Sequence, residues 1–172
     1  MLLVILTVIA VVLIGWYFFS HKLVSDAEEL VIQKLAALDR AHRQREDLAR
    51  QLLNSGSTDQ DLENDWLHAM ETNVNPEQVD AHTIRAYAQQ QLILDHALKA
   101  TIAKRKPQAP AVSDSWEVSK LYQDINHQIQ TAVSEYNRTV IAYNERINQF
   151  PINLLPFSEK TPYPKLKPAD IE

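Results

Sequence analysis

The chain has 172 residues, 45% of them hydrophobic, and a formal net charge of −5. It contains no cysteine, which excludes disulfides, thiol catalysis, iron–sulfur clusters and thiolate zinc sites. The mild acidity gives no support for a nucleic-acid-binding surface, which would show a basic excess or a basic face. Only two glycines, Gly15 and Gly56, are present. Because tight β-hairpins depend on glycine-containing turns, a mostly helical fold is favoured.

The first element is an apolar run from Leu2 to Phe19 that contains no charged residue. A helix needs about 20 apolar residues to cross a hydrocarbon core of roughly 30 Å, and Trp16 and Tyr17 suit the headgroup region. A cleaved signal peptide is the alternative, but it needs a basic start and a small-x-small cleavage site, which this run lacks. The sequence therefore predicts a retained transmembrane anchor over residues 1–22.

The basic residues that flank the anchor predict its orientation. Lys22, Lys34 and Arg40 follow the span, whereas only the α-amino group precedes it. The positive-inside rule counts these cations and largely ignores nearby acidic residues. It places the body of the protein in the cytoplasm, on the bacterial inner membrane, with a periplasmic body as the alternative.

A helical bundle is predicted over residues 23–150. No breaker separates the anchor from the segment that ends at Asn54, so one helix should leave the membrane and become the first bundle helix, with Gly56 as its C-cap. Its apolar residues recur at spacings of three, four or seven, which predicts one buried face. They are Ala27, Leu30, Val31, Leu35, Leu38, Ala41, Leu48 and Leu52. A short acidic helix from Asp59 to Met70 should follow.

Two longer helices complete the expected bundle. One begins at Asn75-Pro76, where Asn suits the N-cap and Pro the first helical position, and runs to about Arg105. Its predicted buried face comprises Ile84, Tyr87, Ala88, Leu94, Leu98 and Ile102. The other begins at Asp114, which forms with Glu117 a pattern like a capping box. Its apolar stripe comprises Val118, Leu121, Ile125, Ile129, Val133, Tyr136, Val140, Tyr143, Ile147 and Phe150.

The last segment, residues 151–172, is rich in proline and therefore cannot be helical. Pro151 should stop the preceding helix. Apolar residues predict that the segment packs along the bundle; they are Ile152, Leu154, Leu155, Phe157, Tyr163 and Leu166. The expected fold is all-α: a single N-terminal transmembrane helix continues into an antiparallel four-helix bundle, and an extended Pro-rich C-terminal tail follows.

Two Tyr-Asn pairs stand one heptad apart near the end of the last helix, and a Phe-Pro pair closes it. These are Tyr136-Asn137, Tyr143-Asn144 and Phe150-Pro151. Together with Val140, Ile147, Asn153, Leu154 and Phe157, they resemble the C-terminal signature of the LemA family. A second stretch, Arg45-Glu46-Asp47-Leu48, resembles the Arg-x-Asp-Leu motif of that family. The family usually continues with Ile-Pro-Asn-Leu-Val, whereas this chain has Ala49-Arg50-Gln51-Leu52-Leu53.

The resemblance implies a membrane-anchored protein with a soluble antiparallel four-helix bundle. It brings no established catalytic activity. Relatives are associated with membrane organisation, including vesicle formation in magnetosome-forming bacteria. The missing proline marks this chain as a divergent member, whose first bundle helix need not bend after Leu48.

The Tyr-Asn pairs allow two interpretations. In the first, Tyr136 and Tyr143 fill the core while Asn137 and Asn144 bond to neighbouring helices or to the tail backbone. In the second, the same face receives a partner protein. We favour the structural interpretation, because buried amides commonly fix register in helical assemblies.

The strongest hypothesis for an enzyme rests on three Asp-x-x-His pairs: Asp39 and His42, Asp65 and His68, and Asp124 and His127. Di-iron bundles use Glu-x-x-His pairs whose ligands project inward. Because these pairs do not coincide with the apolar stripes, we expect them on a solvated or boundary face. The chain also lacks Gly-x-Ser-x-Gly and glycine-rich phosphate motifs. We therefore expect no catalytic residue, metal ion or cofactor.

These features predict a non-enzymatic, membrane-anchored scaffold or accessory protein that acts through protein–protein contacts of its bundle. The alternatives are a membrane-shaping protein that oligomerises, or a metal-dependent enzyme with a site in the bundle. The expected partners are the membrane, other membrane or membrane-associated proteins and, as an open alternative, further copies of the chain. Nucleic acid is not expected to bind.

Overall fold

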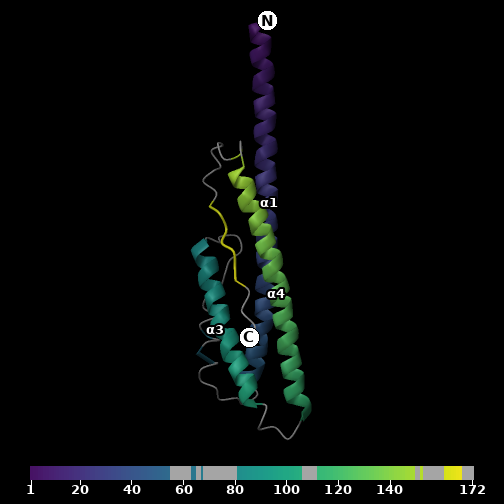
Figure 1. The fold of residues 1–172 in the computed structure, drawn as a ribbon, viewed down its shortest axis with the longest axis vertical. Coiled ribbons are helices and arrows are strands. Elements are labelled where there is room, and N and C mark those ends of the chain that lie inside the picture. The colour runs from purple at the N-terminus through teal and green to yellow at the C-terminus, as the bar shows by residue number, and fades with distance from the viewer. Residues whose placement is uncertain are drawn as a thin grey trace.

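The computed structural model describes residues 1–54, 63–64, 67, 81–105, 112–149, 152 and 161–167. Within these ranges no strand occurs, and the long elements are helices: α1 spans Leu2–Asn54, α3 spans Ala81–Arg105 and α4 spans Val112–Asn148. Figure 1 shows α1 extending well beyond the other two helices at its N-terminal end. Most of the short helix expected over residues 59–70, and the start expected at Asn75, lie outside the described residues.

α1 is one uninterrupted helix of 53 residues, about 80 Å long at 1.5 Å per residue. It contains no proline, and a Cβ at Gly15 would meet no heavy atom within 4 Å apart from its chain neighbours and the backbone of the helix itself. The expected continuity between the apolar segment and the first bundle helix is confirmed. The helix continues without interruption past Leu48, where the family motif would place a proline.

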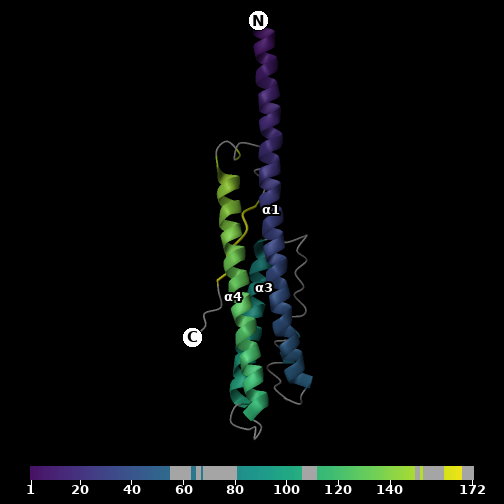
Figure 2. The same ribbon diagram turned by 90° about the vertical axis from the view of Figure 1, so that its right-hand side faces the viewer.

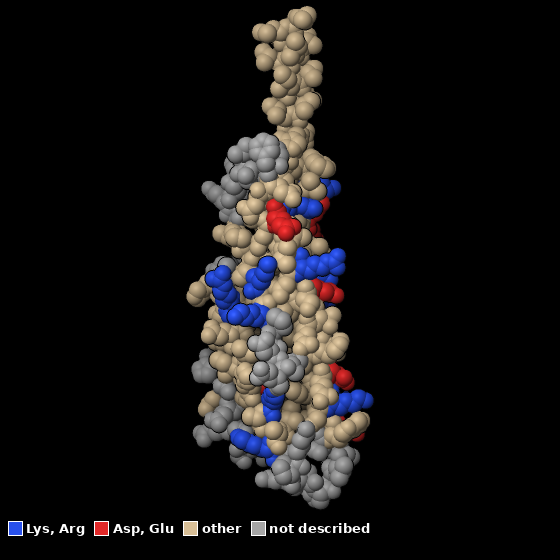
Figure 3. Space-filling view, in the orientation of Figure 1, with Lys and Arg blue, Asp and Glu red and all other residues tan. Residues whose placement is uncertain are grey.

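The N-terminal part of α1 is exposed and apolar on all sides. Nearly every side chain from Leu2 to Phe19 is exposed, and the helix is long and apolar enough to cross a membrane. In the space-filling view this part rises above the bundle and shows no Lys, Arg, Asp or Glu (Figure 3). So large an apolar surface is typical of a segment that contacts lipid or another protein, which is consistent with a membrane anchor.

Ion pairs and hydrogen bonds between the helices fix their relative directions. Lys34 of α1 pairs with Glu135 of α4 at 2.7 Å, and Arg146 donates to the carbonyl oxygen of Leu23 at 3.2 Å. Residue numbers therefore rise on one helix as they fall on the other, so α1 and α4 are antiparallel. Figures 1 and 2 both show these helices lying along each other.

α3 runs parallel to α1 and antiparallel to α4. His42 of α1 bonds to Tyr87 of α3, and three residues further along α1, Arg45 bonds to Asp95. Asp95 in turn accepts from Tyr122, near the start of α4. α3 accordingly packs against the C-terminal half of α1 and the N-terminal half of α4 (Figure 2).

One continuous core joins the three helices. Its members on α1 lie on the side that faces α3 and α4, at the heptad-like spacings expected from the sequence. The largest fully buried apolar side chains are Tyr136, Tyr143, Leu35, Leu38, Ile84, Leu94, Leu98, Val31 and Val140. Leu166, which lies beyond α4 in the chain, belongs to the same core.

Three details of the sequence-based prediction are wrong. Leu30 was placed on the buried face of α1 but is 45% exposed, because the seam runs through Val31 instead. Leu121 is likewise 45% exposed, and Tyr122, three residues before the buried Ile125, takes the seam position. α4 begins at Val112, so Asp114 lies within its first turn rather than at the N-cap.

Candidate functional site

The second half of α4 holds a short segment of the C-terminal tail. Residues 161–167, called the tail segment below, are neither helix nor strand. The segment lies beside α4 and is drawn in yellow in Figure 1. Four α4 residues contact it, and we call them the tail site. They are Tyr136, Asn137, Tyr143 and Asn144.

The two asparagines of the tail site each bond to both polar groups of one tail residue. Asn137 Nδ2 donates to the carbonyl oxygen of Leu166 at 2.6 Å, and its Oδ1 accepts from the Leu166 N–H at 2.8 Å. Asn144 makes the same pair of bonds with Tyr163, at 2.9 and 3.1 Å. A side-chain amide thus takes the place that a neighbouring strand would have, because the main-chain groups of an extended segment need partners.

The spacing of the two asparagines matches the spacing of the two tail residues. Asn137 and Asn144 are seven residues apart on a helix, which corresponds to a rise of about 10.5 Å. Tyr163 and Leu166 are three residues apart in a non-helical segment, which spans about 9–10 Å. Since Asn144 pairs with the earlier tail residue, the tail segment runs antiparallel to α4. The heptad spacing of the Tyr-Asn pairs therefore lets α4 bind an extended chain at two points.

The tyrosines of the tail site are buried, and each contacts the tail segment. The Tyr136 hydroxyl donates to the carbonyl oxygen of Pro164 at 3.2 Å, and the Tyr143 ring packs edge-on against the Tyr163 ring at 5.3 Å. Burial raises the pKa of both α4 tyrosines, so they are neutral. The Tyr143 hydroxyl finds no hydrogen-bond partner within the described part of the chain.

The other predicted signature residues have mixed outcomes. Phe150 and Pro151 lie outside the described residues. In the upstream motif, Arg45 and Leu48 are buried, whereas Asp47 is exposed. The motif therefore presents two side chains to the core and one to solvent.

A buried polar network surrounds Arg45 and connects all three helices. Arg45, only 2% exposed, donates to Asp95 at 2.9 Å and to Gln91 at 3.2 Å. Gln91 donates in turn to Glu46 at 2.7 Å, and Tyr122 donates to Asp95 at 3.1 Å. Burial is also the main cause that raises the pKa of the Tyr122 hydroxyl to about 12. A charge in such a position is tolerated because it is paired and hydrogen-bonded.

A second cluster, one turn earlier on α1, centres on Tyr87. Its hydroxyl donates to Asp39 at 2.9 Å, and the carboxylate also accepts from Arg43 at 2.8 Å. The Tyr87 hydroxyl has one proton, which it donates to Asp39. His42 Nδ1 lies 3.1 Å from the same hydroxyl oxygen, so this nitrogen must carry a proton and donate it to that oxygen. Burial, and the nearby charge of Arg45, hold the pKa of His42 well below its usual value, so the imidazole is neutral.

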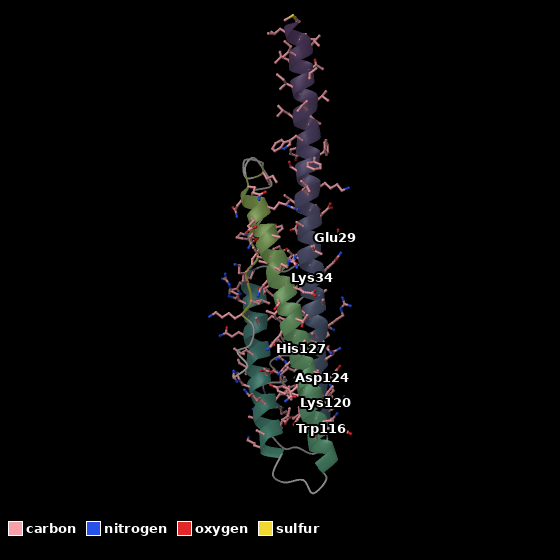
Figure 4. The ribbon with its side chains drawn as sticks, turned by 45° about the vertical axis from the view of Figure 1, so that its right-hand side comes forward. Glu29, Lys34, Trp116, Lys120, Asp124 and His127 are labelled. Atoms are coloured by element: carbon pink, nitrogen blue, oxygen red, sulfur yellow. The ribbon has the colours of Figure 1, made fainter. Side chains whose placement is uncertain are left out.

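The burial of His42 corrects the sequence-based expectation. Its imidazole is 5% exposed, not on a solvated or boundary face, because it shares the seam with Leu38 and Arg45. Asp124 and His127 do lie exposed on α4, in line with Lys120 and Trp116 (Figure 4). The third pair, Asp65 and His68, is outside the described residues. Within the described ranges, no group of three or more His, Asp or Glu residues could hold a metal ion.

Sequence reasoning missed Gln91, Asp95 and Tyr122. A signal for the first was present: Gln91 falls at a seam position of α3, between the apolar residues Tyr87 and Leu94. A polar residue at such a position predicts a buried partner. The sequence does not indicate which helix provides the partner of Gln91.

A groove of about 600 Å³ lies between α1 and α4, at the end of the bundle next to the exposed apolar segment. Residues that line it include Asp26, Leu30, Lys34, Glu135, Arg138 and Arg146. Its lining combines apolar side chains with side chains of both charges. Asp26 lies seven positions after Phe19, the last residue of the apolar segment, which is about 10 Å along the helix.

Together, the fold and these contacts define a class of protein: a helical bundle on a helix that is suited to cross a membrane, with its tail bound along α4. The family model described as LemA family matches residues 34–165, well over half of the chain. The chain therefore belongs to the LemA family. The matched region contains the Arg45–Leu48 motif and both Tyr-Asn pairs. No curated protein and no solved structure was found to match the chain.

Proposed function

We propose that this protein is a non-enzymatic scaffold that is anchored in the membrane and holds other membrane proteins through its bundle. The continuity of α1 is the observation that supports this most. The same helix carries the exposed apolar segment and the buried seam from Val24 to Leu52. Because no break separates them, the bundle would stand at a fixed angle on the membrane rather than on a loose tether.

We also propose that the bundle contains a fourth helix, between α1 and α3. These two helices run parallel, so the chain has to return between them. From the contacts of α1 with α3, Ala81 lies level with about residue 34 of α1, and the return is roughly 30 Å. The helix predicted from Asp59 to Met70 would provide most of it and complete an up-down-up-down bundle. The rest of the Pro-rich tail, residues 151–172, would stay extended, as its described part does.

The groove between α1 and α4 is the surface that we propose for partner contact. It begins about 10 Å beyond the apolar segment, so a protein that reaches it would itself be in or close to the membrane. Leu30 is exposed in this groove although apolar, and Arg138 and Arg146 can pair with acidic groups of a partner. By the positive-inside rule, this surface would face the cytoplasm of a bacterium.

Site-specific photo-crosslinking in cells tests the proposal. A photoreactive residue at Leu30 should give discrete adducts with membrane proteins. The same photoreactive residue at Leu92, a leucine of similar exposure on α3, is the matched control and should give few adducts. Adding charge to the groove by Arg138→Glu should abolish the adducts from position 30. Equal labelling from both positions, or adducts that survive Arg138→Glu, would contradict a partner surface in this groove.

A further inference from the structure

We propose that the tail site is an exchangeable site, and that the tail segment of a second copy of the chain occupies it when two copies stand side by side in the membrane. In the structure, the site holds the tail segment of its own chain. The proposal goes beyond the scaffold function, since it requires no other protein. Its result would be a reciprocal, domain-swapped pair.

The site recognises main chain more than side chains. All four bonds of Asn137 and Asn144 are made to N–H and C=O groups, and Tyr136 donates to a further carbonyl. Such contacts depend on an extended backbone and on the spacing of its N–H groups. Nothing in them distinguishes the chain's own tail from an identical tail on a neighbour.

The prolines of the tail segment set its register. Asn144 requires an N–H, which Tyr163 provides. A shift of one residue in either direction would bring Pro162 or Pro164 to this position, and neither has an N–H to donate. A shift of two residues would bring Pro164 or Pro168 opposite Asn137, which likewise requires an N–H. Shifts of one or two residues are therefore excluded, which keeps Leu166 in the core. A second copy satisfies this pattern at every position.

The connection is long enough for exchange. Twelve residues, 149–160, separate the end of α4 from the tail segment, and twelve residues can span at most roughly 40 Å. Equivalent helices of two adjacent bundles lie a few helix diameters of about 10–12 Å apart, so the site of an adjacent bundle is within reach. Exchange would preserve every bond, and anchoring on one membrane raises the effective concentration of neighbours. The density of the protein in the membrane would therefore decide between the closed and the exchanged form.

Two full-length variants in trans test the proposal. The site variant, Asn137→Ala with Asn144→Ala, keeps its tail; the tail variant, Tyr163→Pro with Leu166→Pro, keeps its site but lacks the two N–H groups. With different affinity tags and in mild detergent, the two should co-purify at a ratio of one to one, while each alone should be monomeric by native mass spectrometry. A chain that carries all four changes is the matched control and should not pair with the site variant.

Monomers in the mixture, with both variants retaining their helical circular dichroism, would overturn the proposal. If the alanine variant loses its helical signal, Asn137→Asp with Asn144→Asp replaces it. Aspartate keeps the shape of the asparagine side chain, but its carboxylate cannot donate to the tail carbonyls. A peptide of residues 161–168 gives an independent measurement and should bind the tail variant. A peptide with proline at 163 and 166 should bind at least tenfold more weakly. Equal binding of both peptides would also overturn the proposal.

Discussion

Asn137 and Leu166 are joined by two hydrogen bonds across 29 positions of sequence, one given and one accepted by the same side-chain amide. The arrangement is that of one rung in a β-ladder, with an asparagine in place of the second strand. It accounts for the recurrence of the Tyr-Asn amides after seven residues, since seven helical residues rise about as far as three extended residues span. The tail segment is thereby part of the folded core, although it has no secondary structure of its own.

Replacing Asn137 by Ala should lower the free energy of unfolding by about 1–3 kcal/mol. The reason is that the N–H and C=O groups of Leu166, a buried residue, would lose both partners. Asn144→Ala should have a similar effect through Tyr163. Chemical denaturation followed by circular dichroism measures both.

Asn148→Ala is the matched control for these changes. Among the described residues, its amide donates to the carbonyl oxygen of Asn144, within the same helix, and the side chain is exposed. The loss should stay below about 0.5 kcal/mol. A control as destabilising as the two tail-site variants would mean that helix propensity, and not the tail, accounts for the effect.

Tyr136 and Tyr143 should respond in opposite ways to loss of the hydroxyl group. Tyr136→Phe removes the donor to Pro164 and should cost about 1 kcal/mol. Tyr143→Phe removes a buried hydroxyl that lacks a partner among the described residues, so it should be neutral or stabilising. Thermal denaturation of the two variants and of the unchanged protein under the same conditions measures these stability differences. A destabilised Tyr143→Phe variant would show that this hydroxyl has a partner.

The helices of this chain could be predicted from its sequence because their determinants are local. Apolar residues at spacings of three and four predict a helix and its buried face, and the absence of a breaker after Phe19 correctly predicted a continuous α1. One-residue errors, such as Leu121 in place of Tyr122, arise because neighbouring positions on a helix are only 100° apart.

The pairings between helices could not be predicted in the same way. Arg45 finds Asp95 and Gln91 across about fifty positions, and no local pattern relates them. His42 was expected near solvent because its Asp-x-x-His pair was judged not to coincide with the apolar stripe, yet His42 is buried and both it and Asp39 bond to Tyr87. The asparagines of the tail site were expected to bond to other helices or to the tail backbone, and only the structure distinguishes these partners.

Arg45→Ala should destabilise the bundle by about 3–5 kcal/mol, because the carboxylate of Asp95 would be left buried without its ion pair. The double change Arg45→Met with Asp95→Leu should recover much of this loss, since it removes both charges and retains volume. A double-mutant cycle of denaturation experiments measures the coupling. The exposed pair Lys34 and Glu135 is the control and should show little coupling. Additive effects of Arg45 and Asp95 would contradict a stabilising pair.

The stability of the bundle should fall as the pH decreases below about 6.5, through His42. Burial lowers the pKa of this imidazole in the folded protein, whereas the unfolded chain binds the proton at its ordinary pKa of about 6.5. The unfolded state therefore binds more protons in the window below that value. The unfolding free energy should decrease by up to about 1.4 kcal/mol per pH unit until the folded pKa is reached.

Glu46 contributes with the opposite sign and has to be separated from His42. Burial raises its pKa, so the folded state binds more protons above about 4.5, and this contribution is lost as the pH rises. The pH dependence should therefore be measured in a Glu46→Gln background, with and without His42→Gln. Loss of His42 should flatten the slope between about pH 5 and 6.5, whereas His127→Gln, an exposed change on α4, should leave it intact. An unchanged slope without His42 would assign the pH dependence to other groups.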